Sequence, residues 1–293
     1  MDERALVLGG GGSAGNAWLI GVVAGLLEGG LDVTDADLVI GTSAGATAAV
    51  QVTGASATGL CADILGAEPP PREARNSPDG ARARAVPAVD HMERTGRIIA
   101  AAQDPADMRR RLGAAALELE AASDGSGQAR WRAIVASRLP SQQWPEGPTL
   151  ITAVDARTGE PVVFDRHSGV ELADAVAAST ASGVAYGIGD DRYIDGGYRR
   201  NENADLAAGY AWVLVLSPLG GRTRHPLEWG TNLAAQVDEL RAGGSRVETI
   251  LPDSASLDAF GTNLMDPTTR PPAARAGHEQ GRAVAGQLEA FWR

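Results

Sequence analysis

A serine flanked by glycines lies near the start of the chain, in Gly41-Thr42-Ser43-Ala44-Gly45. The segment follows the G-x-S-x-G pattern, which presents a serine on a sharp turn between a strand and a helix. Gly41 and Gly45 suit this turn because side chains at those positions would collide with the adjoining strand and helix. An unassisted serine hydroxyl is a weak nucleophile and needs a base. The pattern predicts that Ser43 is the nucleophile of an acyl-transfer reaction.

A glycine cluster, Gly9–Gly15, precedes this serine and contains G-x-G-x-x-G as Gly10, Gly12 and Gly15. Backbone N–H groups that are exposed where a helix begins attract negative charge. Two functions fit this loop: holding the pyrophosphate of a dinucleotide, or holding the oxyanion of a tetrahedral intermediate. The sequence therefore predicts an anion-binding loop, with its ligand open between these two.

The nucleotide alternative requires an acidic residue about 20 residues beyond the loop, at the end of a second strand. Asp32, Asp35 and Asp37 lie near that distance, but the apolar run Leu38–Ile40 leads into Gly41 rather than into an acid. A glycine loop after one strand and a serine turn after the next are complementary halves of an acyl-transfer site. We therefore favour the oxyanion function.

A candidate base is Asp195, which follows an apolar run and precedes two glycines, Gly196 and Gly197, although an aspartate that merely forms a turn fits this pattern equally well. A free aspartate has a pKa near 3.9, so burial beside a dry acyl pocket must raise it for efficient proton transfer. The rival base is a histidine, since α/β-hydrolases use the chain order serine, acid, histidine. His225 and His278 satisfy that order, but both lie in polar segments and are expected at the surface.

Three motifs in succession, GGGGSAG, GTSAG and DGGYRRN, resemble those of the patatin-like phospholipases and lipid acyl hydrolases. The resemblance covers about residues 5–216 and implies a Ser–Asp dyad in place of a triad. It implies a lipid ester substrate (a phospholipid, lysophospholipid or acylglycerol) and transient contact with a membrane surface. By this resemblance the site consists of the nucleophile Ser43, the base Asp195, the oxyanion loop Gly10, Gly11 and Gly12, and the supporting glycines Gly15, Gly41, Gly45 and Gly196.

The sequence departs from the family pattern in two places. The family usually has arginine before the last glycine of the loop, where this chain has Ala14, and it tends to have proline in the segment before the aspartate, where residues 182–186 contain none. Alanine supplies neither charge nor hydrogen bonds. Its presence weakens the expectation of a phospholipid headgroup and keeps a non-catalytic lipid- or nucleotide-binding protein, or a His-assisted esterase, as alternatives.

The elements that position these motifs follow from apolar periodicity. Ala5–Leu8 and Leu38–Ile40 read as buried strands, and Asn16–Glu28 has helical spacing. Strands alternating with helices predict a three-layer α/β/α fold around a central, mostly parallel sheet. We expect one domain over residues 1–293, with a helical insertion over about 66–147 and a C-terminal helical segment over about 270–293.

Composition argues against several classes of function. The formal net charge is -11 and every basic residue is arginine, so the chain is a poor candidate for nucleic-acid binding. No His/Cys/Asp/Glu set has metal-ligand spacing, so we expect neither metal nor cofactor. The single cysteine, Cys61, reads as a buried apolar residue, and the N-terminus lacks a signal sequence, which predicts a cytoplasmic location. Surface exposure is expected for the arginines 72, 75, 82, 84 and 109–111. The sequence leaves the oligomeric state open.

Overall fold

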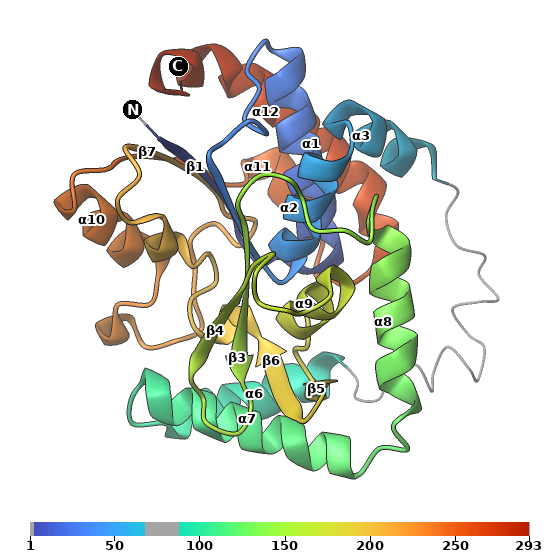
Figure 1. The fold of residues 1–293 in the computed structure, drawn as a ribbon. Coiled ribbons are helices and arrows are strands. Elements are labelled where there is room, and N and C mark those ends of the chain that lie inside the picture. Colours follow the sequence, from blue (N-terminus) through green and yellow to red (C-terminus); the bar gives the residue numbers. More distant parts are fainter. Residues whose placement is uncertain (1–2, 68–87, 293) are drawn as a thin grey trace.

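A mixed sheet forms the centre of the molecule (Figure 1). The computed structural model describes residues 3–67 and 88–292, and the sheet order is β5-β6-β3-β2-β1-β7-β8, with β4 paired to β3. The strands β3, β2, β1, β7 and β8 run parallel to one another, whereas β4, β5 and β6 pair in antiparallel fashion. The strands are β1 (Arg4–Leu8), β2 (Leu38–Thr42), β3 (Thr149–Asp155), β4 (Pro161–Phe164), β5 (Tyr186–Ile188), β6 (Asp191–Asp195), β7 (Trp212–Leu216) and β8 (Arg246–Ile250).

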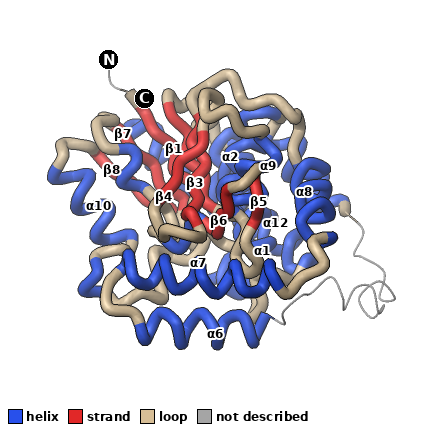
Figure 2. The backbone as a smooth tube through the Cα atoms, turned by 60° about the horizontal axis from the view of Figure 1, so that its bottom comes forward, coloured by secondary structure: helices blue, strands red, loops and turns tan. Residues whose placement is uncertain are grey.

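Helices cover both faces of this sheet, as the tube view in Figure 2 also shows. Labels follow Figure 1, in which some numbers are not used. The α-helices are α1 (Gly12–Glu28), α2 (Ala44–Gly54), α3 (Ala57–Gly66), α6 (Ala88–Ala101), α7 (Pro105–Ala121), α8 (Ser126–Arg138), α9 (Leu172–Ser179), α10 (Leu233–Ala242), α11 (Ser254–Phe260) and α12 (Arg270–Trp292). Short 3₁₀ turns are η1 (Gly196–Tyr198), η2 (Ala204–Ala207), η3 (Leu227–Trp229) and η4 (Pro267–Thr269).

The alternation of side chains along β1 explains the three layers. Leu6 and Leu8 point to one face, where they join the core formed with α1, α2, α3 and α12. Ala5 and Val7 point to the other face and pack with residues of η2 and α10. In Figure 1, α10 accordingly lies on the opposite side of the sheet from α1, α2 and α12. The three-layer α/β/α prediction is confirmed.

The described part of the segment expected as a helical insertion contains the helices α6, α7 and α8. Met108 and Leu112 of α7 pack against Val154 of β3 and Ile194 of β6, so α7 contributes to the core beside these strands. Figure 2 shows α6 and α7 lying next to each other across one end of the molecule. The arginines 72, 75, 82 and 84 lie outside the described residues, whereas Arg110 and Arg111 are exposed and pair with Asp107.

The C-terminal helix α12 packs along α1 so closely that backbone meets backbone. A Cβ placed on Gly25 would lie 2.1 Å from the carbonyl oxygen of His278, and one placed on Gly281 would lie 2.3 Å from that of Val22. The sheet also includes β8, beyond Leu216, and the sequence did not predict this strand. Most of β8 is exposed at the sheet edge, so it lacks the apolar run of a buried strand.

Within residues 3–67 and 88–292, no single helix is long and apolar enough to cross a bilayer; only α2 and α3 taken together reach that length and composition, and they meet at 119°. The same residues contain no group of three or more His, Cys, Asp or Glu that could hold a metal ion. Cys61 is buried and unpaired, as expected.

Candidate active site

Ser43 lies on a sharp turn between β2 and α2. Its φ of 53° places it in the left-handed region, which a non-glycine residue seldom adopts and which is often found at functional sites. The flanking glycines are required by contact: a Cβ on Gly45 would lie 1.9 Å from the carbonyl oxygen of Leu8, and one on Gly41 would lie 2.6 Å from the Cα of Ala46. The packing thus leaves no room for a side chain at either position.

Strand register brings Asp195 to this turn. The last residue of β2, Thr42, pairs with Thr152 of β3, and the last residue of β6, Asp195, pairs with the next residue of β3, Ala153. Because β4 occupies the opposite edge of β3, the antiparallel β6 and the parallel β2 share one edge. Their carboxyl ends therefore meet head to head, and the residues at those ends are brought together.

The two side chains are in direct contact. Ser43 Oγ donates a hydrogen bond of 2.7 Å to Asp195 Oδ2, and the other carboxylate oxygen, Oδ1, accepts one of 2.8 Å from the N–H of Gly197. A glycine is needed at position 196, between Asp195 and Gly197, since a Cβ placed on Gly196 would lie 2.3 Å from Thr152 Oγ1. Both carboxylate oxygens are thus oriented, one of them toward the serine.

Burial tunes this carboxyl group. Asp195 is 7% exposed, and burial raises its pKa to about 6, although the hydrogen bonds from Gly197 and Ser43 act in the opposite direction. A carboxylate whose pKa approaches neutrality is a more effective proton acceptor than a free aspartate. The Ser43 hydroxyl thus contacts a carboxylate of raised basicity.

The glycine loop lies beside the serine: a Cβ on Gly10 would lie 3.5 Å from the Cβ of Ser43. The N–H of Gly10 is already engaged, since it donates to the carbonyl oxygen of Asn201 at 3.1 Å. The N–H groups of Gly11 and Gly12 have no acceptor among the described residues, and neither has that of Ala44, directly after the serine. Gly12, with a φ of 64°, opens α1. Of the three glycines expected to bind an oxyanion, Gly10 thus differs from the other two.

Asn201 holds Gly10 from two sides. Besides its carbonyl oxygen, which accepts from the N–H of Gly10, its Nδ2 donates to the carbonyl oxygen of Gly10 at 3.3 Å and to Glu202 Oε1 at 2.9 Å. Glu202 is 1% exposed, and it accepts further hydrogen bonds from Ser217 Oγ at 2.6 Å and Gln236 Nε2 at 3.3 Å. The buried Glu202 therefore holds Asn201, which in turn holds Gly10.

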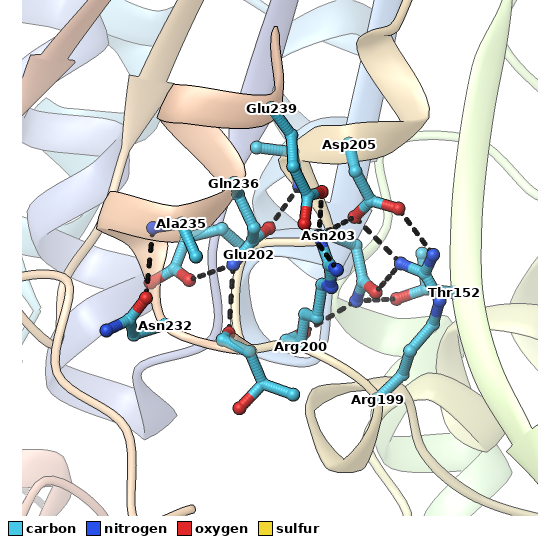
Figure 3. A network of polar contacts seen from close by, with 12 residues as sticks. Thr152, Arg199, Arg200, Glu202, Asn203, Asp205, Asn232, Ala235, Gln236 and Glu239 are labelled. Carbon is cyan, nitrogen blue, oxygen red and sulfur yellow. Dashed lines mark hydrogen bonds and ion pairs between the residues drawn. The ribbon is translucent and has the colours of Figure 1, made fainter. Parts of the chain in front are cut away.

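Asn203 continues the same network toward the strand ends (Figure 3). It is fully buried with a φ of 54°, and its Nδ2 lies within hydrogen-bond distance of Thr42 Oγ1, Thr152 Oγ1 and the carbonyl oxygen of Gly196. Arg199 donates to Asn203 Oδ1 at 2.7 Å and also pairs with Asp205, as Figure 3 shows. The segment after the base thus links the nucleophile strand, the base turn and the glycine loop.

A further serine holds the backbone of Ser43. The N–H of Ser43 donates to Ser179 Oγ at 2.9 Å, and Ser179, the last residue of α9, is fully buried. Sequence reasoning assigned no role to Ser179, Asn201, Glu202 or Asn203. The only signal in the sequence was the polar run Asn201-Glu202-Asn203 at the end of the aspartate motif. The spacing of these residues alone does not reveal which groups they contact.

No histidine contacts Ser43 or Asp195 within the described part of the chain. His225, expected at the surface, is buried instead, with its Nδ1 3.0 Å from Thr231 Oγ1; burial, with Arg224 and Arg109 nearby, lowers its pKa to about 4. His278 Nε2 lies 2.6 Å from Glu28 Oε2. The sequence misplaced His225 because its neighbours in the chain are polar, whereas its environment is set by packing from other segments.

The acids required by the nucleotide alternative lie at the wrong end of β1. Arg4, the first residue of β1, bonds through its N–H to Asp37 Oδ2 and through its guanidinium to Asp35 Oδ2. The glycine loop follows Leu8, at the opposite end of the strand. These two acids therefore cannot reach a ribose whose phosphates occupy the loop.

The family model described as patatin-like phospholipase matches residues 6–208. The chain belongs to the patatin-like phospholipase family. This patatin-like chain matches no curated protein.

Solved structures similar to the patatin-like chain include VipD from Legionella pneumophila, with 16% identity, a TM-score of 0.44, and coverage of 98% of this chain and 67% of that one. A second is the type III effector protein ExoU, with 17% identity, a TM-score of 0.44, and coverage of 99% and 54%. A third is full-length ExoU in complex with SpcU from Pseudomonas aeruginosa, with 17% identity, a TM-score of 0.35, and coverage of 96% and 53%. The chain thus spans about half to two thirds of these chains.

Proposed function

We propose that this patatin-like protein is a serine hydrolase that cleaves carboxylic ester bonds of lipids through a Ser43–Asp195 dyad. The observation that carries the proposal is the 2.7 Å contact between Ser43 Oγ and Asp195 Oδ2, a carboxylate whose pKa is raised by burial. Family membership supports a lipid acyl hydrolase in general terms.

The proposed reaction has two halves. Asp195 accepts the proton of Ser43 while Oγ attacks the ester carbonyl carbon, and the protonated Asp195 then donates that proton to the leaving alcohol. Water, deprotonated by Asp195, then attacks the acyl-serine. As the bond between the acyl carbon and Oγ breaks, Asp195 returns the proton to Ser43 Oγ and the carboxylic acid leaves. Neither half requires a metal or a cofactor.

The oxyanion formed in each half needs donors near Ser43. The N–H groups of Gly11, Gly12 and Ala44 support this role because no acceptor within the described chain occupies them. Gly10 acts differently in this proposal: its N–H is held by Asn201, so it shapes the loop. The starts of α1 and α2 add the positive ends of two helix dipoles.

The substrate class is a lipid ester, such as a phospholipid, lysophospholipid or acylglycerol. Besides the family, an exposed apolar side chain at the loop supports this class: Met265 is 60% exposed, and its Sδ lies 2.9 Å from where a Cβ of Gly12 would be. An acyl chain entering there would meet an apolar surface.

An active-site probe tests the proposal directly. A fluorophosphonate should label wild-type protein at Ser43 and fail to label Ser43→Ala, while Ser137→Ala, which alters an exposed serine of α8, should be labelled normally. A panel of phospholipid, lysophospholipid and acylglycerol substrates should be hydrolysed by wild type and not by Ser43→Ala or Asp195→Asn. Lipid binding without labelling or turnover would instead indicate a binding protein.

A further inference from the structure

An arginine from the far end of the chain reaches the first turn of α1. Arg270 opens α12, and its Nη1 donates to the carbonyl oxygen of Ser13 at 3.1 Å and to Asn16 Oδ1 at 3.0 Å. Asn16 Nδ2 in turn lies 3.4 Å from the carbonyl oxygen of Ala44, the residue after the nucleophile. One side chain therefore separates this guanidinium from the serine turn.

Arg270 carries a charge that no described acid neutralises. None of the ion pairs within residues 3–67 and 88–292 includes it, and its Nη2 and Nε have no acceptor there. Burial, with the charge of Arg138 nearby, lowers its pKa to about 10, so it stays protonated at neutral pH. A partly buried cation without a counter-ion is costly, and an arriving anion would relieve that cost.

Arg138 provides a second cation on the same side. Its carbonyl oxygen accepts from Gln51 Nε2 at 3.0 Å, and Gln51 Oε1 accepts from Asn16 Nδ2 at 3.0 Å, which links Arg138 to the residue that orients Arg270. Its guanidinium lies over the ring of Trp131, 5.7 Å from the centroid, and bonds to no acid in the described chain. The backbone of Arg138 is thus linked to the Asn16–Gln51 pair, and its charge acts on Arg270.

We propose that Arg270, assisted by Arg138, binds a phosphate group of the acyl-ester substrate next to the Ser43 site; this inference rests on the proposed hydrolase function. The planar guanidinium suits phosphate because it can donate two parallel hydrogen bonds to its oxygens. The start of α1 lies next to Arg270 and adds to the positive potential.

This proposal reverses the expectation drawn from Ala14. The side chain of Ala14 is fully buried in the core, and its N–H donates to the carbonyl oxygen of Leu264, in the segment before α12. The cation beside the loop comes from Arg270 instead, so the alanine does not argue against a phosphate-bearing lipid.

A matched pair of substrates tests the phosphate site. A monoacylglycerol and the lysophosphatidic acid with the same acyl chain differ only in the phosphate. We expect Arg270→Gln to lower the ratio of their kcat/KM values, phosphate over neutral, at least about tenfold and mainly through KM. Arg270→Lys should keep part of the ratio, and Arg275→Gln, an exposed arginine on the same helix, should keep all of it.

An unchanged ratio in Arg270→Gln, or an equal loss in Arg275→Gln, would overturn the proposal. Thermal melts of both Arg270 variants verify folding, and Arg138→Gln should lower the ratio to a smaller extent.

A binding measurement separates this inference from the hydrolase proposal. Calorimetry on Ser43→Ala with decyl phosphate and with inorganic phosphate requires no turnover. Decyl phosphate binding that weakens at least about tenfold in Ser43→Ala/Arg270→Gln supports a lipid phosphate. Equal, Arg270-dependent binding of inorganic phosphate supports the same site with free phosphate as ligand. Binding of neither, or binding independent of Arg270, overturns it; absent turnover of both esters by wild type would count against the hydrolase alone.

Discussion

Asp195 combines two opposed requirements in one side chain. In the proposed reaction it must be ionised to accept the proton of Ser43, yet its burial disfavours the ionised form. The hydrogen bonds from Gly197 and Ser43 offset part of that penalty, which leaves the pKa at about 6. The residue is thus charged at neutral pH and remains more basic than a free carboxylate.

Activity should follow the ionisation of this group. Because the carboxylate is the active form, kcat/KM for a neutral ester should rise with pH through about 6 and level off above neutrality. At pH 5 it should be about tenfold below the plateau, with a slope of one proton. A profile measured with an uncharged substrate checks this, and a midpoint near 4 would show that burial does not tune the base.

Replacing the charge should separate activity from stability. Asp195 has a raised pKa in the folded state, so its ionisation destabilises the fold; the penalty is absent below the unfolded pKa and complete above about pH 6. Asp195→Asn should therefore abolish turnover yet raise the free energy of unfolding at pH 7.5 by about 1 to 3 kcal/mol.

That stability gain should shrink as the pH falls toward 4. Urea unfolding at several pH values measures it, with Asp205→Asn as the opposite control: that carboxyl group pairs with Arg199, and its pKa is lowered, so its loss should destabilise. A destabilised Asp195→Asn at pH 7.5 would contradict the argument.

At the scale of elements, β3 aligns Ser43 with Asp195 because it pairs with both β2 and β6. Thr152 and Ala153 are neighbours on β3, and they pair with the last residues of β2 and β6. A shift of either strand by one residue would turn its side chains to the opposite face and separate Ser43 from Asp195. The segment containing Asn201, Glu202 and Asn203 then ties this pair to the glycine loop.

Loosening that segment should impair turnover more than binding. Asn201→Ala removes the side-chain bond to the carbonyl oxygen of Gly10, so the oxyanion donors next to it lose their fixed geometry. We expect kcat to fall roughly tenfold or more with little change in KM. Asn232→Ala is the control: it removes the N-cap of α10, which should cost about 1 kcal/mol of stability and leave kcat unchanged.

The sequence predicted the parts of this site that depend on local geometry. Ser43 and its flanking glycines could be proposed because a sharp turn constrains residue types close together in the chain, whereas Asp195 was proposed mainly from the family resemblance. The engaged N–H of Gly10 could not, because its partner comes from another segment. The same holds for β8, whose exposed edge position removes the apolar pattern, and for His225, which is buried by segments distant in the chain.

At the scale of the molecule, two helices distant in the chain depend on each other. Nearly every residue of α1 is buried, and α12 supplies much of its cover through glycines on both helices. The same contact carries Arg270 to the start of α1. The packing of α1 against α12 thus affects the shape of the candidate active site.

Two glycines of α12 provide a matched test of this contact. A Cβ on Gly281 would lie 2.3 Å from the carbonyl oxygen of Val22, whereas one on Gly286 would meet nothing within 4 Å. Gly281→Ala should lower the free energy of unfolding by about 3 kcal/mol because the helices must move apart. Gly286→Ala should raise it by up to about 1 kcal/mol through helix propensity, and equal effects in denaturant melts would refute the argument.

The pairing of α1 with α12 also bears on biosynthesis. Translation delivers α1 and Ser43 early, whereas Asp195 and then α12 emerge much later. Until then the growing polypeptide carries an apolar helix without its cover, a form that invites chaperones or aggregation. Ser43 meanwhile lacks its proposed proton acceptor. The order of translation should therefore keep the proposed lipase inactive until most of the molecule has left the ribosome.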